Sequence, residues 1–126
     1  MTDIEIDQFI ARKPAAVWRA LTEPELLARW WAAGDIKPIV GHRFTLDMGS
    51  WGQQACEVLE VEPERLLSFT FAEGSLDTTI TWRLEAEGAG TRLLLRHAGF
   101  AEGSTALKGM SSGWPGLLRR LEPALA

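Results

Sequence analysis

The sequence predicts an α+β fold in which one curved antiparallel sheet is covered by a helix close to the C-terminal end. Apolar side chains in residues 36–100 recur with a period of two, and short turns separate the runs, which is typical of an antiparallel meander. Apolar residues in the segment 107–125 recur near helical spacing. Because a meander with one apolar face needs a cover, we expect this helix to lie against the sheet.

Length and composition limit the class of protein. The 126 residues have the size of one domain, 1–126, with 46% hydrophobic residues and a net charge of −4. An acidic balance disfavours a nucleic-acid binder, and no apolar run is long enough to insert into a membrane. One cysteine excludes an intrachain disulfide, and the first residues lack the pattern of a secretory signal. We therefore expect a cytoplasmic protein.

The N-terminal third predicts a strand followed by two short helices. Alternation of apolar and acidic residues in the segment 4–11 indicates a half-buried strand. Pro14 is suited to the first turn of a helix. Thr22 and Glu25 have the spacing of a capping box, which predicts that the second helix starts at Thr22, and Gly34 is expected to end it.

Strand parity assigns residues to the face that the helix covers. Side chains two positions apart on a strand point to the same face, so each run of alternating apolar residues marks the inward side. The inward residues predicted in this way are Phe44, Leu46, Leu67, Phe69, Phe71, Ile80, Trp82, Leu84, Leu93, Leu95 and His97.

The C-terminal helix contains a strong breaker. Pro115 cannot donate its backbone N–H, so the helix is expected to kink or restart there. Ser111 or Ser112 would then act as the N-cap of the ordered part. This prediction implies a short covering helix.

Several segments along the chain resemble one known superfamily. They are Pro14–Pro24, Trp30–Trp31, Val40–Phe44, Cys56–Pro63, Arg65–Leu66, Gly90–Leu93, His97–Phe100 and Gly113–Trp114. In this order they are similar to the START-like (SRPBCC, birch-pollen-allergen-like) superfamily, in the branch of homologues of the heat-shock-protein-90 ATPase activator. The resemblance implies a helix-grip fold: a curved antiparallel sheet wrapped on a C-terminal helix, with two short helices between strands 1 and 2. His42 departs from the pattern, because many relatives have a second glycine there.

The resemblance implies a pocket more directly than it implies a reaction. Members of the superfamily bind apolar ligands, some are cyclases or dehydratases, and one branch contacts a chaperone. We therefore expect an apolar small molecule to bind between the sheet and the C-terminal helix, without a cofactor. The residues expected to line this pocket are Trp31, Met48, Trp51, Phe69, Phe71, Trp82, Leu95, His97, Met110 and Trp114.

Two other functions are kept as alternatives. His97 points inward by parity and is the one candidate acid or base for a cyclase, dehydratase or hydrolase, although a structural histidine is the simpler interpretation. The second alternative is a module that binds a chaperone or another protein, and an unpaired sheet edge would also permit a homodimer instead of a monomer. His42 and His97 are too few for a metal site, and Cys56 is interpreted as a small buried residue.

Overall fold

The computed structural model describes residues 2–125 and confirms the α+β fold. Its six antiparallel strands form one sheet in the order β1-β6-β5-β4-β3-β2. The strands are β1 (Thr2–Ile10), β2 (Arg43–Asp47), β3 (Gln53–Glu62), β4 (Leu66–Phe71), β5 (Thr78–Glu87) and β6 (Gly90–Phe100). The helices are α1 (Pro14–Thr22), α2 (Pro24–Trp30), the short 3₁₀ helix η1 (Gly49–Trp51) and α3 (Thr105–Ala124).

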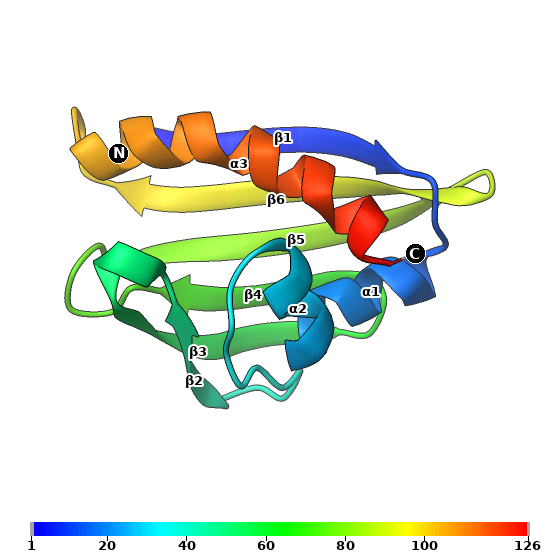
Figure 1. The fold of residues 1–126 in the computed structure, drawn as a ribbon, viewed down its shortest axis with the longest axis horizontal. Coiled ribbons are helices and arrows are strands. Elements are labelled where there is room, and N and C mark those ends of the chain that lie inside the picture. The colour runs from blue at the N-terminus through cyan, green and yellow to red at the C-terminus, as the bar shows by residue number, and fades with distance from the viewer. Residues whose placement is uncertain (1, 126) are drawn as a thin grey trace.

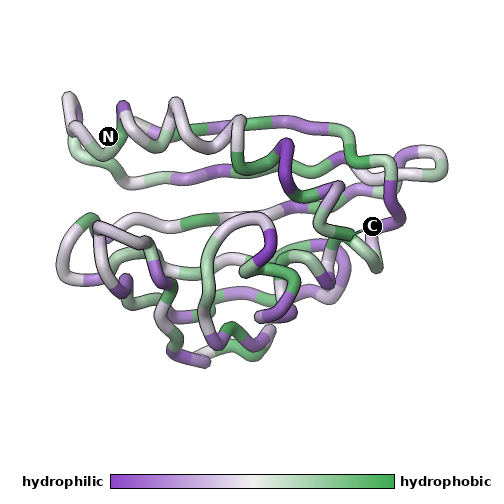
Figure 2. The backbone as a smooth tube through the Cα atoms, in the orientation of Figure 1, coloured by the Kyte–Doolittle hydropathy of each residue, from purple (hydrophilic) through white to green (hydrophobic). Residues whose placement is uncertain are grey.

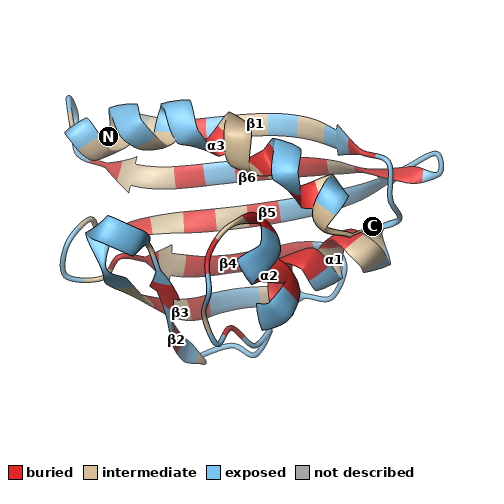
Figure 3. Ribbon diagram, in the orientation of Figure 1, coloured by how far each residue is buried: buried red, intermediate tan, exposed pale blue. Residues whose placement is uncertain are grey.

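All three α-helices lie on the same side of the sheet (Figure 1). Helix α3 runs along β1 and β6 and then slopes toward α1. Helix α2 also packs against α3. Hydropathy alternates along most strands (Figure 2), and buried residues alternate with more exposed ones on β2 and in most of β5 and β6 (Figure 3). Strand β4 is the exception, because Leu66 and Ser68 on its other face are buried as well. The sheet therefore has an inner face under the helices and an outer face toward solvent.

The inner face is apolar, as the parity of the sequence predicts. Its buried side chains include Phe44, Leu46, Leu67, Phe69, Phe71, Ile80, Trp82, Leu84, Leu93 and Leu95. They form one cluster with the buried residues of the three helices. Burying each large side chain of this kind contributes roughly 1.5–3 kcal/mol, so this cluster is the main source of stability.

The predicted capping box at the start of α2 is wrong. Thr22 is the last residue of α1, and its hydroxyl donates to the carbonyl oxygen of Trp18 at 2.8 Å instead of accepting from a residue of α2. The N-cap of α2 is Glu23, without a side-chain cap, and Pro24 opens the helix. A threonine hydroxyl can bond the carbonyl four residues earlier, and here that bond competes successfully with capping.

Gly34 lies beyond the end of α2, which finishes at Trp30, so it does not stop the helix as predicted. It forms a β-bridge with Leu46 at the edge of β2. A Cβ atom added at Gly34 would lie 2.3 Å from the carbonyl oxygen of Thr45. Glycine is needed at this position because two backbones come together there.

The predicted restart of the C-terminal helix at Ser111 or Ser112 is also wrong. Helix α3 runs without a break through Pro115, and its N-cap is Ser104, whose hydroxyl accepts from the backbone N–H of Leu107 at 3.2 Å. The buried face of α3, which contains Trp114, offsets the hydrogen bond that proline cannot make. Within residues 2–125, no helix combines the length and apolar character needed to cross a membrane.

The start of α3 gives a direct test. Ser104→Ala removes the N-cap and should lower the free energy of unfolding by about 1 kcal/mol in urea denaturation. The matched control is Ser112→Ala, which is exposed within the helix and should change stability by only a few tenths of a kcal/mol. A larger effect at Ser112 than at Ser104 would show that the helix restarts near Pro115.

Candidate functional site

Aromatic side chains fill the space between the sheet and α3. Trp114 of α3 lies with its ring centroid 5.6 Å from that of Trp82 on β5 and 5.0 Å from that of Trp31, the C-cap of α2. The ring of Trp31 is 6.0 Å from that of Phe71 and 6.5 Å from that of Phe69, both on β4. These spacings are those of direct aromatic contacts, so the rings pack on one another.

His97 of β6 lies in the middle of this cluster and is fully buried. The indole Nε1–H of Trp114 donates to its Nδ1 at 3.1 Å. The Nε2 atom of His97 is 2.8 Å from the hydroxyl of Thr78, which in turn lies 3.1 Å from the carbonyl oxygen of Phe71. Because indole can only donate, Nδ1 must be the acceptor and Nε2 must carry the proton.

This arrangement keeps His97 neutral. Every donor in the chain from Trp114 through His97 and Thr78 to Phe71 has an acceptor. Burial lowers the pKa of His97 to about 4, because the charged imidazolium would lose its hydration. Both ring nitrogens are engaged within the protein, so this geometry supports the structural interpretation of His97 over an acid or base.

The indole of Trp31 differs from those of Trp30 and Trp114 in its hydrogen bonding. The indole of Trp30 donates to the carbonyl oxygen of Ala20 at 2.9 Å, and that of Trp114 donates to His97. The Nε1 atom of Trp31 is buried and has no hydrogen-bond partner. An unpaired buried N–H costs roughly 1–3 kcal/mol, so it requires an explanation.

The structure brings most of the expected pocket residues together. Those that are buried or half-buried in or against the core cluster are Trp31, Met48, Phe69, Phe71, Trp82, Leu95, His97, Met110 and Trp114. Trp51 is the exception and is corrected, because its side chain is 81% exposed. It lies in η1, between Gly49 and Gly52 at positive φ, and this tight turn ends the strand alternation on which its predicted direction depended.

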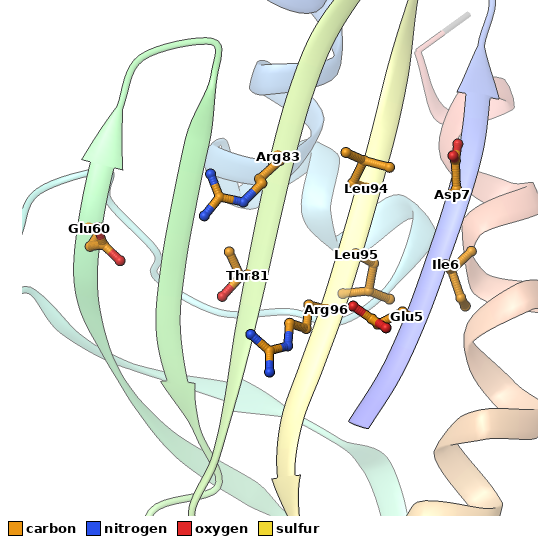
Figure 4. Close-up of a pocket in the computed structure, with 9 residues that line it drawn as sticks. All are labelled: Glu5, Ile6, Asp7, Glu60, Thr81, Arg83, Leu94, Leu95 and Arg96. Carbon is orange, nitrogen blue, oxygen red and sulfur yellow. The ribbon is translucent and has the colours of Figure 1, made fainter. Parts of the chain in front are cut away.

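The hollows on the surface of the described residues include the following two. One, of about 240 Å³, is lined by Asp35, Arg43, Phe44, Thr45, Ala55 and Cys56. The other, of about 460 Å³, is lined by Glu5, Ile6, Asp7, Glu60, Thr81, Arg83, Leu94, Leu95 and Arg96 (Figure 4). Of the expected pocket residues, Leu95 alone contributes to either hollow.

Other reactive groups are inert or dispersed. Burial raises the pKa of the Cys56 thiol to about 12, so the nucleophilic thiolate is scarce at neutral pH. In the part of the chain that the structure describes, no three His, Cys, Asp or Glu side chains are placed to hold a metal ion.

Sequence reasoning missed Thr78, the hydroxyl that completes the His97 chain. Thr78 is two positions before Ile80 and therefore shares its inward parity. A polar residue at an inward position could have been recognised as a partner for an inward histidine. The orphaned indole of Trp31 had no such signal, because sequence does not show which donors find acceptors.

The neutral state of His97 predicts a pH dependence of stability. Its pKa in the folded protein, about 4, is below the ordinary value of 6.5, so the unfolded chain binds the proton more readily. Stability should be full above pH 6.5, fall as the pH drops from 6.5 to about 4, and then level off, with a total loss on the order of 3 kcal/mol.

Thermal or urea denaturation between pH 7 and 4.5 measures this loss. His97→Gln should remove it, whereas the control His42→Gln should retain it. The carboxyl groups of Asp3 and Glu73 have lowered pKa values and lose their contributions mainly below their ordinary values of 3.8 and 4.5, outside this window. An unchanged pH profile in His97→Gln would show that His97 is not the titrating group.

Comparison with known proteins places the fold in a family. MLL2253 from Mesorhizobium loti is 36% identical, with a TM-score of 0.91 over 98% of this chain and 96% of that chain. BH1534 from Bacillus halodurans is 28% identical, with a TM-score of 0.87 over 100% of this chain and 98% of that chain. The Aha1 dimer from Colwellia psychrerythraea is 22% identical, with a TM-score of 0.86 over 99% of this chain and 96% of that chain. The search of curated proteins gave no match. Residues 11–126 match the family described as "Activator of Hsp90 ATPase homolog 1-like protein", and the chain belongs to that family.

Proposed function

We propose that the protein binds a small, mostly apolar molecule between the sheet and α3, and that an oxygen of this ligand accepts a hydrogen bond from Trp31. The orphaned Nε1–H of Trp31 is the observation that carries the proposal. It is an unpaired buried donor on an aromatic wall where the indoles of Trp30 and Trp114, and both ring nitrogens of His97, already have partners.

Trp31 lies where a ligand can reach it. It caps α2 and is half-buried, while Trp30, Trp82 and Trp114 are fully buried. Its ring contacts Trp114 and Phe71, and its side chain is partly exposed, while Nε1 itself is buried. A ligand that binds at Trp31 therefore has to displace the side chains that cover Nε1.

Two half-buried methionines are the side chains that we expect to move when the ligand binds. Met48, next to η1, and Met110, in the first half of α3, are half-buried against the core cluster. Methionine is unbranched and flexible, and it adjusts to the shape of its neighbours. The aromatic packing described above then represents the closed arrangement, and a ligand replaces methionine contacts with its own apolar surface, gaining roughly 25 cal/mol per Å² buried.

An enzymatic function using His97 has less support. Catalysis would require a ring nitrogen that is free to reach the substrate, and both nitrogens are bonded to Trp114 and Thr78. A pKa of about 4 also makes His97 a poor base near neutral pH. We therefore favour binding over turnover.

A pair of probes tests the role of Trp31. 1-Acetylnaphthalene and 1-ethylnaphthalene have similar shapes, but only the ketone offers an acceptor oxygen. Isothermal titration calorimetry should show that the wild-type protein binds the ketone about fivefold more tightly, because one hydrogen bond contributes about 1 kcal/mol.

Trp31→Phe keeps an aromatic ring and removes the donor, so it should abolish this advantage. The control Trp51→Phe makes the same change at an exposed tryptophan and should preserve it. Equal affinities of the wild-type protein for both probes, or failure of both to bind, would refute the proposed site.

A further inference from the structure

The hollow of about 460 Å³ lies on the outer face of the sheet, away from the interior site (Figure 4). Arg83 of β5 and Arg96 of β6 alternate with the inward residues Trp82 and Leu95 and therefore point outward. An open sheet face with scattered solvated charges would need no explanation. The charged residues over this hollow instead lie in rows that cross the strands.

Two rows of paired residues cross the outer face from β3 to β1. The first row consists of Glu60, Ser68, Thr81, Arg96 and Glu5. The second row consists of Glu62, Leu66, Arg83, Leu94 and Asp7. Each row has an acidic residue on β3, one arginine on β5 or β6, and an acidic residue on β1. The two arginines therefore lie near the centre of the face, with carboxylates on both sides. Glu60 and Glu5 form no ion pair within residues 2–125, whereas Asp7 is paired with Arg92 and Glu62 with Arg65.

The two central arginines differ in how far they are already engaged. Within residues 2–125, Arg83 forms no ion pair. Arg96 uses Nε and Nη2 to bind Asp3, at 3.1 and 2.7 Å. Figure 4 shows both arginine side chains extending toward the side of the sheet that carries Glu60. Two like charges aimed the same way favour a negatively charged group between them.

A buried polar group lies in the same rows. Ser68 is 2% exposed, and its hydroxyl has no hydrogen-bond partner. It is paired across the strands with Glu60 and Thr81, which both line the hollow, so it lies on the outer face between them. Its unpaired hydroxyl, like the indole of Trp31 on the inner face, requires an explanation.

We infer that this hollow binds an extended segment of a protein partner, with one acidic side chain at its centre and a basic side chain on either side. The acidic group binds Arg83 and the Nη1 atom of Arg96, which Asp3 does not use, and the basic groups reach Glu60 on β3 and Glu5 on β1. Four strand spacings separate β3 from β1, or about 19 Å. An extended chain covers this length in about six residue steps, which places each basic residue about three positions from the acidic centre.

Two seven-residue peptides of identical composition test the order of charges. The first is Lys-Ser-Ser-Glu-Ser-Ser-Lys, and its isomer is Lys-Ser-Ser-Lys-Ser-Ser-Glu, both with acetylated and amidated ends. Their equal net charge removes any general attraction to the acidic protein. In NMR titrations at low salt, the first peptide should bind at least fivefold more tightly and should shift the amide signals of Thr81, Arg83 and Leu94.

Arg83→Glu should reverse this preference, because the centre of the face becomes negative, and Arg83→Gln should remove it. Arg120→Glu is the matched control: it makes the same charge change at an exposed arginine of α3, outside the hollow and the two rows, and should keep the preference. Melting curves establish that all variants fold. Equal binding of the two isomers by the wild-type protein, absence of binding at millimolar peptide, or equal loss in Arg120→Glu and Arg83→Glu would each overturn the inference.

Discussion

The contact between Trp114 and the sheet is the constraint on which the rest of the structure depends. The inner face of a six-stranded sheet is apolar and cannot remain open to water, and α3 covers it through Trp114, Leu118 and Leu121. A buried indole also needs an acceptor for its N–H, and His97 supplies one. Apolar burial thus holds the helix on the sheet, and one hydrogen bond sets its position along β6.

That bond determines the chemistry of the interior. His97 can accept from Trp114 only while its Nδ1 carries no proton, so the interior is stable with a neutral imidazole. The Thr78 hydroxyl then accepts the remaining ring N–H, and the chain of donors ends at a backbone carbonyl. With these groups satisfied, the indole of Trp31 is left as a buried donor without a partner, and the proposed ligand would bind there.

Neighbouring residues on β5 and β6 contribute to two chemically different surfaces. Trp82 and Leu95 belong to the interior, while Arg83 and Arg96 belong to the charged outer face. Side-chain alternation makes this possible, because one strand positions both sets without bringing them into contact. An apolar ligand inside and a charged partner outside would therefore contact different side chains of the same sheet. A substitution of Arg83 leaves the interior wall in place.

The sequence by itself determined the meander, the inward direction of His97 and the aromatic residues of the inner face, because a period of two in side-chain direction follows directly from the geometry of a strand. Local signals at Thr22 and Ser112 were misleading, since hydrogen bonds and packing made elsewhere in the fold outweigh a cap of about 1 kcal/mol or a proline breaker of about 3 kcal/mol. The strand alternation was misleading at Trp51, because a tight turn interrupts it there. Only the tertiary structure decided which donors remain unpaired and which charges share a row. Both depend on strand register and helix docking, which join residues far apart in the chain.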